Sequence, residues 1–249
     1  MIKDPPLLTV RRNFPRPSEA ALRALRSVPT GFIVDCMNGR GALDYRIKPL
    51  DSDNSKFVAP IVTCHPGPGD NLAVFAALEI AQRGDAIFIA TDTFTKTAVA
   101  GDNMMAMGRN RGITGFVTDG LMRDIDGILP VGLPAFCRGI TPNSCTRNGP
   151  GTAGMPVVMG GICVDAGEIA VADQDVRPRL RDPTPSARGR GKPLSPDPLR
   201  FGQYGGDTRV ARLGPHGAHR LIFDDHQARL VERYLWQPLG LHLFYGSVG

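Results

Sequence analysis

Residues 57–118 alternate between two kinds of segment, and this alternation limits the folds open to the chain. Three apolar or β-branched runs typical of buried strands lie at 57–63 (FVAPIVT), 85–91 (DAIFIAT) and 113–118 (ITGFVT). Two helical segments lie between them, at 71–83 and 103–110, and glycines 84 and 112 are expected to end them. Strands and helices joined by short connections predict an α/β crossover unit.

The rest of the chain predicts shorter elements. Pro15–Ser27 is expected to form a helix with Ser18 as its N-cap. After Asp124, short runs joined by glycine and proline predict strands at 135–137, 156–159, 162–164 and 168–172. They suggest a β layer packed beside the α/β unit. His226–Leu235 is the candidate for one terminal helix.

Composition changes abruptly near Asp175. A chain of 249 residues suits one domain with an appendage, so we predict a folded domain at 1–175 and an atypical extension, partly disordered, at 176–249. Twelve of the 29 basic and six of the 24 acidic residues follow Asp175, so the net charge of +5 comes from the extension. Residues 177–198 are rich in Arg, Pro, Ser and Gly, which predicts a disordered or extended segment. No aromatic pattern accompanies this charge, so we expect no nucleic-acid partner.

The cysteines and the N-terminus favour a cytoplasmic protein. Five cysteines, none spaced as Cys-x-x-Cys, are expected to be reduced thiols. The first 14 residues lack an apolar signal region, and no apolar run is long enough to span a bilayer. We therefore expect neither secretion nor membrane insertion.

Residues 149–154 (GPGTAG) match the G-x-G-x-x-G pattern of dinucleotide-binding loops. Such a loop needs a strand before it and a helix after it. Here the preceding segment is expected to be a loop and the following one a strand, so we predict no nucleotide site.

The tripeptide Gly-Asp-Asn occurs twice, at 69–71 and at 101–103. Each aspartate stands at a predicted helix N-cap, and this structural role suffices for Asp70. Asp102 differs because its helix returns through a strand to Arg123 and Asp124, which places all three at one edge of the α/β unit.

This corner contains the groups needed to bind a 2-oxo acid. Backbone N–H groups of Asn103 and Met104 can hold a carboxylate, and Arg123 supplies a bidentate positive charge. Asp102 and Asp124 supply hard oxygen ligands for Mg²⁺ or Mn²⁺. On spacing alone, a surface ion pair between Arg123 and Asp124 is slightly favoured over a catalytic role.

A resemblance changes this balance. The sequence resembles the RraA-like family in six stretches: Pro29-Thr30-Gly31, Gly41–Asp44, Pro68–Ala73, Gly101-Asp102, Asp119–Asp124 and Gly160–Val164. The likeness covers about residues 20–175, and its most specific part is an Asp, twenty residues, then Arg-Asp. The family includes the 4-hydroxy-4-methyl-2-oxoglutarate aldolases, which also decarboxylate oxaloacetate, and the regulator of ribonuclease activity A.

The resemblance implies a swivelling β/β/α fold assembled as trimers or hexamers. It also implies that Asp124 holds the metal, that Asp102 supports the metal and its waters, and that Arg123 binds the pyruvyl group. Gly101, Asn103 and Met104 would complete the substrate pocket. In the regulator branch the Asp after the Arg is replaced, so Asp124 favours the lyase.

The extension departs from the family pattern. After Asp175, relatives continue with Gly and a Val/Ile run, whereas this chain continues with Val176-Arg177-Pro178-Arg179. A reading-frame change or a lineage-specific extension would each produce this composition. The sequence therefore predicts a metal-dependent class II aldolase and oxaloacetate decarboxylase that forms pyruvate; the alternative is a non-enzymatic regulator that binds a protein partner.

Overall fold

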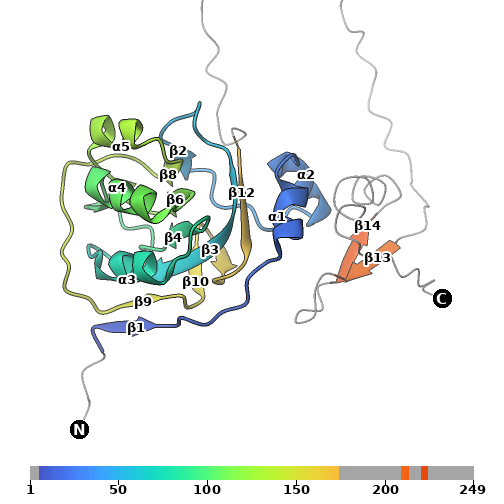
Figure 1. The fold of residues 1–249 in the computed structure, drawn as a ribbon, viewed down its shortest axis with the longest axis horizontal. Coiled ribbons are helices and arrows are strands. Elements are labelled where there is room, and N and C mark those ends of the chain that lie inside the picture. The colour runs from blue at the N-terminus through green and yellow to red at the C-terminus, as the bar shows by residue number, and fades with distance from the viewer. Residues whose placement is uncertain (1–5, 174–208, 213–219, 224–249) are drawn as a thin grey trace, which may run out of the picture.

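The computed structural model describes residues 6–173, 209–212 and 220–223, as Figure 1 shows. In the last two ranges, β13 (Arg209–Arg212) pairs antiparallel with β14 (Arg220–Phe223). The segment 177–198 and the helix expected at 226–235 lie outside the described residues. No helix among the described residues has both the length and the apolar character needed to cross a membrane.

A mixed sheet forms the centre of residues 6–173. Its strand order is β1 (Leu8–Val10), β9 (Gly151–Ala153), β3 (Phe57–His65), β4 (Ala86–Ile89), β6 (Gly115–Thr118), β8 (Ala135–Cys137) and β2 (Lys48–Pro49). An eighth strand, β12 (Ile169–Ala172), pairs antiparallel with the first half of β3. The pairs β3–β4, β4–β6 and β6–β8 are parallel, which confirms the predicted crossover unit.

Helices cover one face of this sheet and a hairpin covers the other. Helices α3 (Leu72–Ile80), α4 (Asp102–Arg111) and α5 (Ile125–Val131) lie together at the left of Figure 1. The hairpin of β10 (Val157–Met159) and β11 (Ile162–Val164) packs against the opposite face. Hairpin, sheet and helices make up a β/β/α arrangement, which confirms the predicted fold class.

Two apolar cores follow from the alternation of side chains along each strand. In β3, Val62 and Cys64 contact the helical layer, whereas Ala59 and Ile61 contact the hairpin side. The neighbouring strands continue both cores because they too carry apolar residues on both faces. Burial on both sides explains why these runs read as continuous apolar sequence.

Two further helices lie between β1 and β2 in the chain, and the first was predicted correctly. Helix α1 (Glu19–Leu25) begins after Ser18, whose Oγ accepts a hydrogen bond from the N–H of Ala21 at 3.2 Å. Helix α2 (Thr30–Cys36) begins after Pro29.

The predicted end of the helix at 71–83 is wrong. Helix α3 stops at Ile80, and Ala81 continues in an extended conformation, so Gly84 is not its stop signal. In contrast, α4 ends at Gly112 as expected.

Three elements near Arg123 escape the sequence prediction. They are β5 (Ala98–Ala100), β7 (Leu121–Met122) and the helix α5. The strands are too short to produce a visible periodicity, and α5 contains both a glycine and a proline. All three prove essential to the candidate site.

Candidate functional site

A small two-stranded sheet brings Asp102 and the Arg123-Asp124 pair together. Strands β5 and β7 are parallel, with Ala98 opposite Leu121 and Ala100 opposite Met122. The N–H of Arg123 also donates to the carbonyl of Ala100 at 3.1 Å. Because parallel strands end at the same edge, the segments that follow them begin side by side. The predicted grouping is correct, but β7 rather than the end of β6 delivers Arg123.

Asp124 lies directly against Gly101. Its Oδ2 is 3.1 Å from Nε of Arg123, and these two side chains are 41% and 37% exposed. A Cβ placed on Gly101 would lie 2.7 Å from Oδ2 of Asp124, so only glycine allows the carboxylate to approach this closely. Asp124 itself has left-handed backbone angles, φ 59° and ψ 47°, at the N-cap of α5. Asp and Asn tolerate this conformation better than most residues.

Asp102 is the first residue of α4, and Gly101 is the N-cap, so the predicted cap position is wrong by one residue. Oδ1 of Asp102 accepts hydrogen bonds from the backbone N–H of Asn103 at 2.6 Å and from its Nδ2 at 3.1 Å. On the other side, a Cβ on Gly127 would lie 2.6 Å from Cβ of Asp102. The glycine of α5 therefore permits close packing of the two helices at the site.

The interaction at Asn103 bears on the predicted substrate pocket. Its backbone N–H, expected to hold a substrate carboxylate, is partnered by Asp102. The N–H of Met104 also belongs to the first helical turn, where backbone donors have no intrahelical acceptor. The N–H of Met104 is therefore the more readily available donor for a substrate carboxylate. The N–H of Asn103 would first have to give up its hydrogen bond to Asp102.

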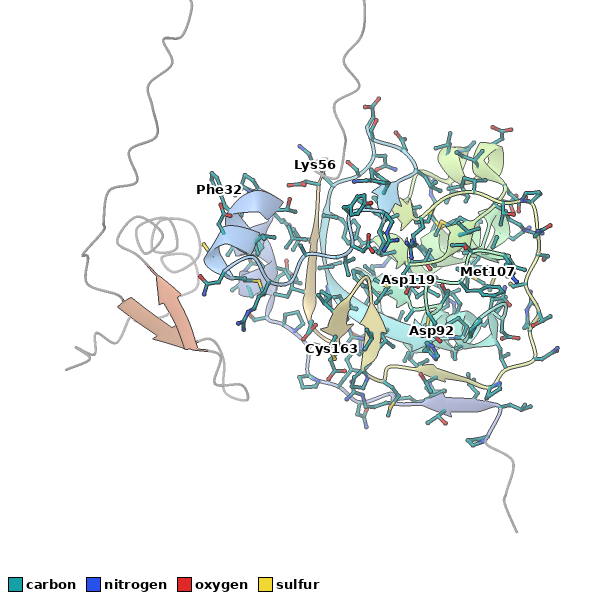
Figure 2. The ribbon with its side chains drawn as sticks, turned by 180° about the vertical axis from the view of Figure 1, so that it is seen from behind. Phe32, Lys56, Asp92, Met107, Asp119 and Cys163 are labelled. Atoms are coloured by element: carbon teal, nitrogen blue, oxygen red, sulfur yellow. The ribbon has the colours of Figure 1, made fainter. Side chains whose placement is uncertain are left out.

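A cavity of about 350 Å³ opens at this corner. All six predicted site residues line it: Gly101, Asp102, Asn103, Met104, Arg123 and Asp124. Residues that the sequence did not predict complete the walls: Asn71, Phe75, Ala98, Val99, Ala100, Met107, Ser144, Cys145 and Arg147. Met107 lies at the end of the domain opposite Phe32 of α2 (Figure 2).

One cavity wall comes from residues 144–147, and Asp70 fastens this loop. Asp70 is 6% exposed, and its Oδ1 accepts from the N–H of Leu72 at 2.8 Å. Its Oδ2 accepts from Oγ1 of Thr146 at 2.9 Å and from the N–H of Asn148 at 2.5 Å. The N-cap of α3 is Asn71, so Asp70 stands one position before the cap. Its structural role is confirmed, and it extends beyond the helix to the loop.

These hydrogen bonds change the pKa of Asp70. Burial alone would raise the pKa, but the N–H groups of Leu72 and Asn148 and the hydroxyl of Thr146 stabilise the carboxylate and hold its pKa below the ordinary value. The ionised form of Asp70 therefore fastens the loop at neutral pH.

Arg147 occupies the loop wall of the cavity. Its Nε donates to Oδ1 of Asn71 at 3.3 Å, and its guanidinium carbon is 4.2 Å from the centroid of the Phe75 ring. Both partners come from the start of α3. The sequence gives one hint of this wall, because Asn71 ends the first Gly-Asp-Asn copy, but it gives no sign of Arg147.

Asp119 lies near the site in sequence but has a different role. It is 2% exposed, and its carboxylate accepts hydrogen bonds from the N–H of Thr91 at 2.7 Å and the N–H of Thr93 at 3.2 Å. Figure 2 shows Asp119 close to Asp92, whose Oδ2 is 3.1 Å from Nε2 of His65. Asp119 thus holds the loop after β4, and neither it nor His65 lines the 350 Å³ cavity.

The cysteines offer no activated nucleophile at this site. All five are free thiols, and Cys145 alone lines the cavity. Burial is the largest influence on the Cys145 thiol and raises its pKa above the ordinary value. A thiol with a raised pKa is protonated at neutral pH, which argues against covalent catalysis by Cys145.

A larger hollow of about 950 Å³ lies between α1 and the β3–β12 edge. The acidic groups on its wall are already paired: Asp85 with Arg16 at 2.6 Å, and Asp173 with the N–H and Oγ1 of Thr30 at 2.9 and 2.7 Å. Size alone therefore does not identify the site, and the chemistry favours the smaller cavity.

Comparison with known sequences points to one family. Residues 30–176 match the RraA-like family model, described as Aldolase/RraA. A protein from Halalkalibacterium halodurans named "Putative 4-hydroxy-4-methyl-2-oxoglutarate aldolase" is 38% identical over 150 residues, which cover 60% of this chain and 71% of that protein. A protein from Arabidopsis thaliana with the same name and the number 3 is 32% identical over 119 residues, 48% of this chain and 71% of that protein.

Solved structures show the same fold. Streptomyces coelicolor RraAS2, described as an unusual member of the RNase ES inhibitor RraA protein family, gives a TM-score of 0.58 at 26% identity over 64% of this chain and 84% of that chain. The RNA-processing inhibitor RraA from Thermus thermophilus gives 0.55 at 24% identity over 60% and 90%. The second likeness concerns the fold alone.

Proposed function

Because the chain belongs to the RraA-like, or Aldolase/RraA, family, we propose that it is a divalent-metal-dependent carbon–carbon lyase. Its substrates would be 2-oxo acids of the 4-hydroxy-4-methyl-2-oxoglutarate type, which it would cleave to pyruvate, and oxaloacetate, which it would decarboxylate. The observation that carries this proposal is the pairing of β5 with β7, which gathers Asp102, Arg123 and Asp124 at one cavity. The names of the relatives support the same chemistry.

The residues present fit Mg²⁺ or Mn²⁺. Among the described residues no group of three or more His, Cys, Asp or Glu side chains could hold a metal, and the carboxylates that line the cavity are those of Asp102 and Asp124. Mg²⁺ is commonly held by one or two carboxylates and several waters, whereas a structural zinc site needs four protein ligands. When bound, the ion would supply Lewis-acid polarisation of the keto oxygen.

Arg123 has the charge and geometry to bind the pyruvyl end of the substrate. Within the described residues, Arg123 makes its ionic contact through Nε, to Asp124, which leaves the two terminal nitrogens for a ligand. A guanidinium binds a carboxylate or an enolate through two parallel N–H groups. We assign Met104, through its backbone N–H, to the substrate carboxylate. Gly101 and Asn103 line the same part of the cavity.

In the aldolase reaction the proton of the C4 hydroxyl is removed and the C3–C4 bond breaks. The electron pair of that bond passes to the pyruvyl fragment as an enolate, and the C4 fragment leaves as a carbonyl compound. In the decarboxylation the same bond breaks and carbon dioxide leaves. A proton then adds to C3 in both cases and gives pyruvate. Arg123 would stabilise the enolate charge that both reactions share.

Two further properties belong to the proposal. We expect a homotrimer or homohexamer, which the mass of the purified protein in solution will test. We also place the activity in the cytoplasm, because all five cysteines are free thiols.

The deciding experiment measures pyruvate release from 4-hydroxy-4-methyl-2-oxoglutarate and from oxaloacetate, with Mg²⁺ or with chelator. Arg123→Ala is expected to lower kcat/KM by about 100-fold or more, because it removes the stabilisation of the enolate. Arg40→Ala, at an exposed arginine outside the cavity, is the matched control and is expected to keep wild-type activity. Near-wild-type turnover by Arg123→Ala would refute the assignment. A folded wild-type protein without turnover would favour the non-enzymatic regulator.

A further inference from the structure

We propose that Arg147 determines specificity by binding a second carboxylate, at the end of the substrate remote from the 2-oxo acid. This inference rests on the proposed function and adds to it the residue that selects for the remote carboxylate of the aldol substrate. The cavity has two arginines on its walls, Arg123 after β7 and Arg147 on the loop 144–147. Two separate cationic groups suit a ligand with two separate anionic groups.

The side chain of Arg147 is held in place although the residue is exposed. Its guanidinium lies 4.2 Å from the centre of the Phe75 ring, and Nε donates to Asn71 at 3.3 Å. Stacking and a hydrogen bond through Nε fix the plane of the group without using Nη1 or Nη2. Among the described residues, Arg147 forms no ion pair with a carboxylate, whereas Arg123 is paired with Asp124.

The backbone on both sides of Arg147 is also fixed. Thr146 and Asn148 both donate to Oδ2 of Asp70, at 2.9 and 2.5 Å. The N–H of Asn71 donates to the carbonyl of Thr146 at 3.0 Å, and the N–H of Thr146 donates to the carbonyl of Gly69 at 2.8 Å. The loop is therefore tied to the start of α3, which also supplies Asn71 and Phe75. Asp70 acts as a positioning residue, because it organises the arginine before a ligand arrives.

The two proposed reactions should depend on Arg147 to different extents. In 4-hydroxy-4-methyl-2-oxoglutarate, the remote carboxylate stays charged while the C3–C4 bond breaks, so its contact with Arg147 helps to bind and orient the substrate. In oxaloacetate, the second carboxylate becomes neutral carbon dioxide. An arginine that held this group would stabilise the ground state more than the transition state and would not accelerate the reaction. Oxaloacetate decarboxylation is thus an internal control.

The test compares wild type, Arg147→Met and the matched control Arg40→Met on three substrates with Mg²⁺. The substrates are 4-hydroxy-4-methyl-2-oxoglutarate, 4-hydroxy-2-oxopentanoate, which lacks the second carboxylate, and oxaloacetate. Arg147→Met is expected to raise KM for the first substrate about 10-fold or more and to change kcat less than about threefold. For the other two substrates kcat/KM should stay within about twofold, because 4-hydroxy-2-oxopentanoate lacks the group and ground-state binding of oxaloacetate would change KM and kcat together. Equal losses on all three substrates, or no loss on the first, would overturn the inference.

Asp70→Ala tests the positioning role and should give the same selective rise in KM. Because this variant removes buried hydrogen bonds and could fail to fold, Thr146→Val serves as a second variant that removes only the hydroxyl contacts. Either folded variant is expected to raise KM for the dicarboxylic aldol substrate and to spare 4-hydroxy-2-oxopentanoate. A uniform loss of kcat on both substrates would show that Asp70 does not act through Arg147.

A binding measurement separates failure of this inference from failure of the proposed function. Calorimetric titration with 2-oxoglutarate and with pyruvate, in Mg²⁺ buffer, does not require turnover. Wild type should bind 2-oxoglutarate at least about 10-fold more tightly than Arg147→Met does, whereas the pyruvate affinities should agree. This result in a protein without lyase activity would refute the proposed function and retain Arg147 as an anion-binding residue. Equal affinity of both proteins for 2-oxoglutarate would refute the role of Arg147.

Discussion

The two Gly-Asp-Asn tripeptides lie at the starts of helices α3 and α4, on the same face of the sheet. Their aspartates nevertheless differ in burial and in hydrogen-bond partners. Asp70 is buried, and hydrogen bonds from Leu72, Thr146 and Asn148 occupy its carboxylate. Asp102 is only partly buried, and its carboxylate accepts hydrogen bonds from the adjacent Asn103. The tripeptide itself does not decide the role. The segment that lies beside it does: a loop at the first copy, and Arg123-Asp124 at the second.

Both copies nevertheless contribute to the same cavity. Asn71 of the first copy and Gly101, Asp102 and Asn103 of the second all line it. The first copy arranges a wall, and the second supplies groups with reactive chemistry. A mutation at the first should therefore affect mainly stability and substrate selection, and a mutation at the second should affect mainly turnover.

The largest expected difference is between Asp124 and Asp119, which are close in sequence but differ in exposure. Asp124→Asn keeps a residue that tolerates the left-handed backbone, so the fold should remain while oxaloacetate turnover falls about 100-fold or more. Asp119→Asn should instead lower the free energy of unfolding by about 1–3 kcal/mol, because it weakens the buried bonds to Thr91 and Thr93. Urea unfolding and steady-state kinetics on both variants measure the two effects. The reverse pattern would contradict the assignment of Asp124.

Asp102 and Asp70 provide the direct comparison between the two tripeptides. Asp102→Asn is expected to reduce oxaloacetate turnover about 10- to 100-fold and to leave the unfolding free energy within about 0.5 kcal/mol. Asp70→Asn is expected to lower the unfolding free energy by about 1–3 kcal/mol, with decarboxylation by the folded protein within about threefold of wild type. If Asp70→Asn removes decarboxylation while the protein stays folded, the contrast between the two copies is wrong.

The glycines of the two tripeptides sharpen the comparison. Gly101→Ala places a methyl group 2.7 Å from Oδ2 of Asp124 and 3.1 Å from Cγ of Arg123, so these side chains must move. Turnover should fall about 10-fold. Gly69→Ala puts alanine at φ +72° with its Cβ 3.4 Å from the Phe94 ring, which should cost about 1 kcal/mol of stability and leave kcat unchanged. Paired thermal unfolding and kinetic assays distinguish the two outcomes.

The smallest expected effect is the change of the unfolding free energy with pH in the acidic range. The pKa of Asp70 is lower in the folded protein than in the unfolded chain, so its carboxylate stabilises the fold above the unfolded pKa. That contribution is lost as pH falls through the lower, folded pKa. The difference in unfolding free energy between wild type and Asp70→Asn should therefore shrink as the pH falls below the ordinary pKa of an aspartate. Urea unfolding of both proteins at several pH values measures it, and a constant difference would contradict the lowered pKa.

The sequence predicts the parts of the fold in which local pattern and burial agree. Strands β3, β4 and β6 are continuous apolar runs because both of their faces are covered, and α4 ends at a glycine as expected. Helix α5 escapes prediction because Gly127 and Pro130 argue against a helix. It forms where Ile128 is buried and where Gly127 allows Asp102 to approach. Tertiary packing outweighs local propensity there.

The candidate site likewise contains residues that the sequence predicts and residues that it does not. Spacing predicts that Asp102, Arg123 and Asp124 lie at one edge of the sheet, but a catalytic role is favoured over a surface ion pair only through the family resemblance. Arg147 cannot be predicted from spacing, because its partner Asn71 is 76 positions away. The contact between Arg147 and Asn71 depends on the buried carboxylate of Asp70, which joins the loop 144–147 to the start of α3. A periodic sequence pattern does not reveal such a contact.

The pairing of β5 with β7 also has a consequence for engineering the chain. The candidate site residues are brought together by the contact between β5, which has three residues, and β7, which has two. Helix α4 and strand β6 connect β5 to β7, and the pairing of β5 with β7 fixes the two ends of this connection. Residues grafted at the turn around Gly112, at the far end of α4, should be tolerated, whereas a one-residue deletion within either short strand should misalign the reactive groups. The alignment of the candidate site therefore depends on the two short strands β5 and β7 rather than on the length of the connector between them.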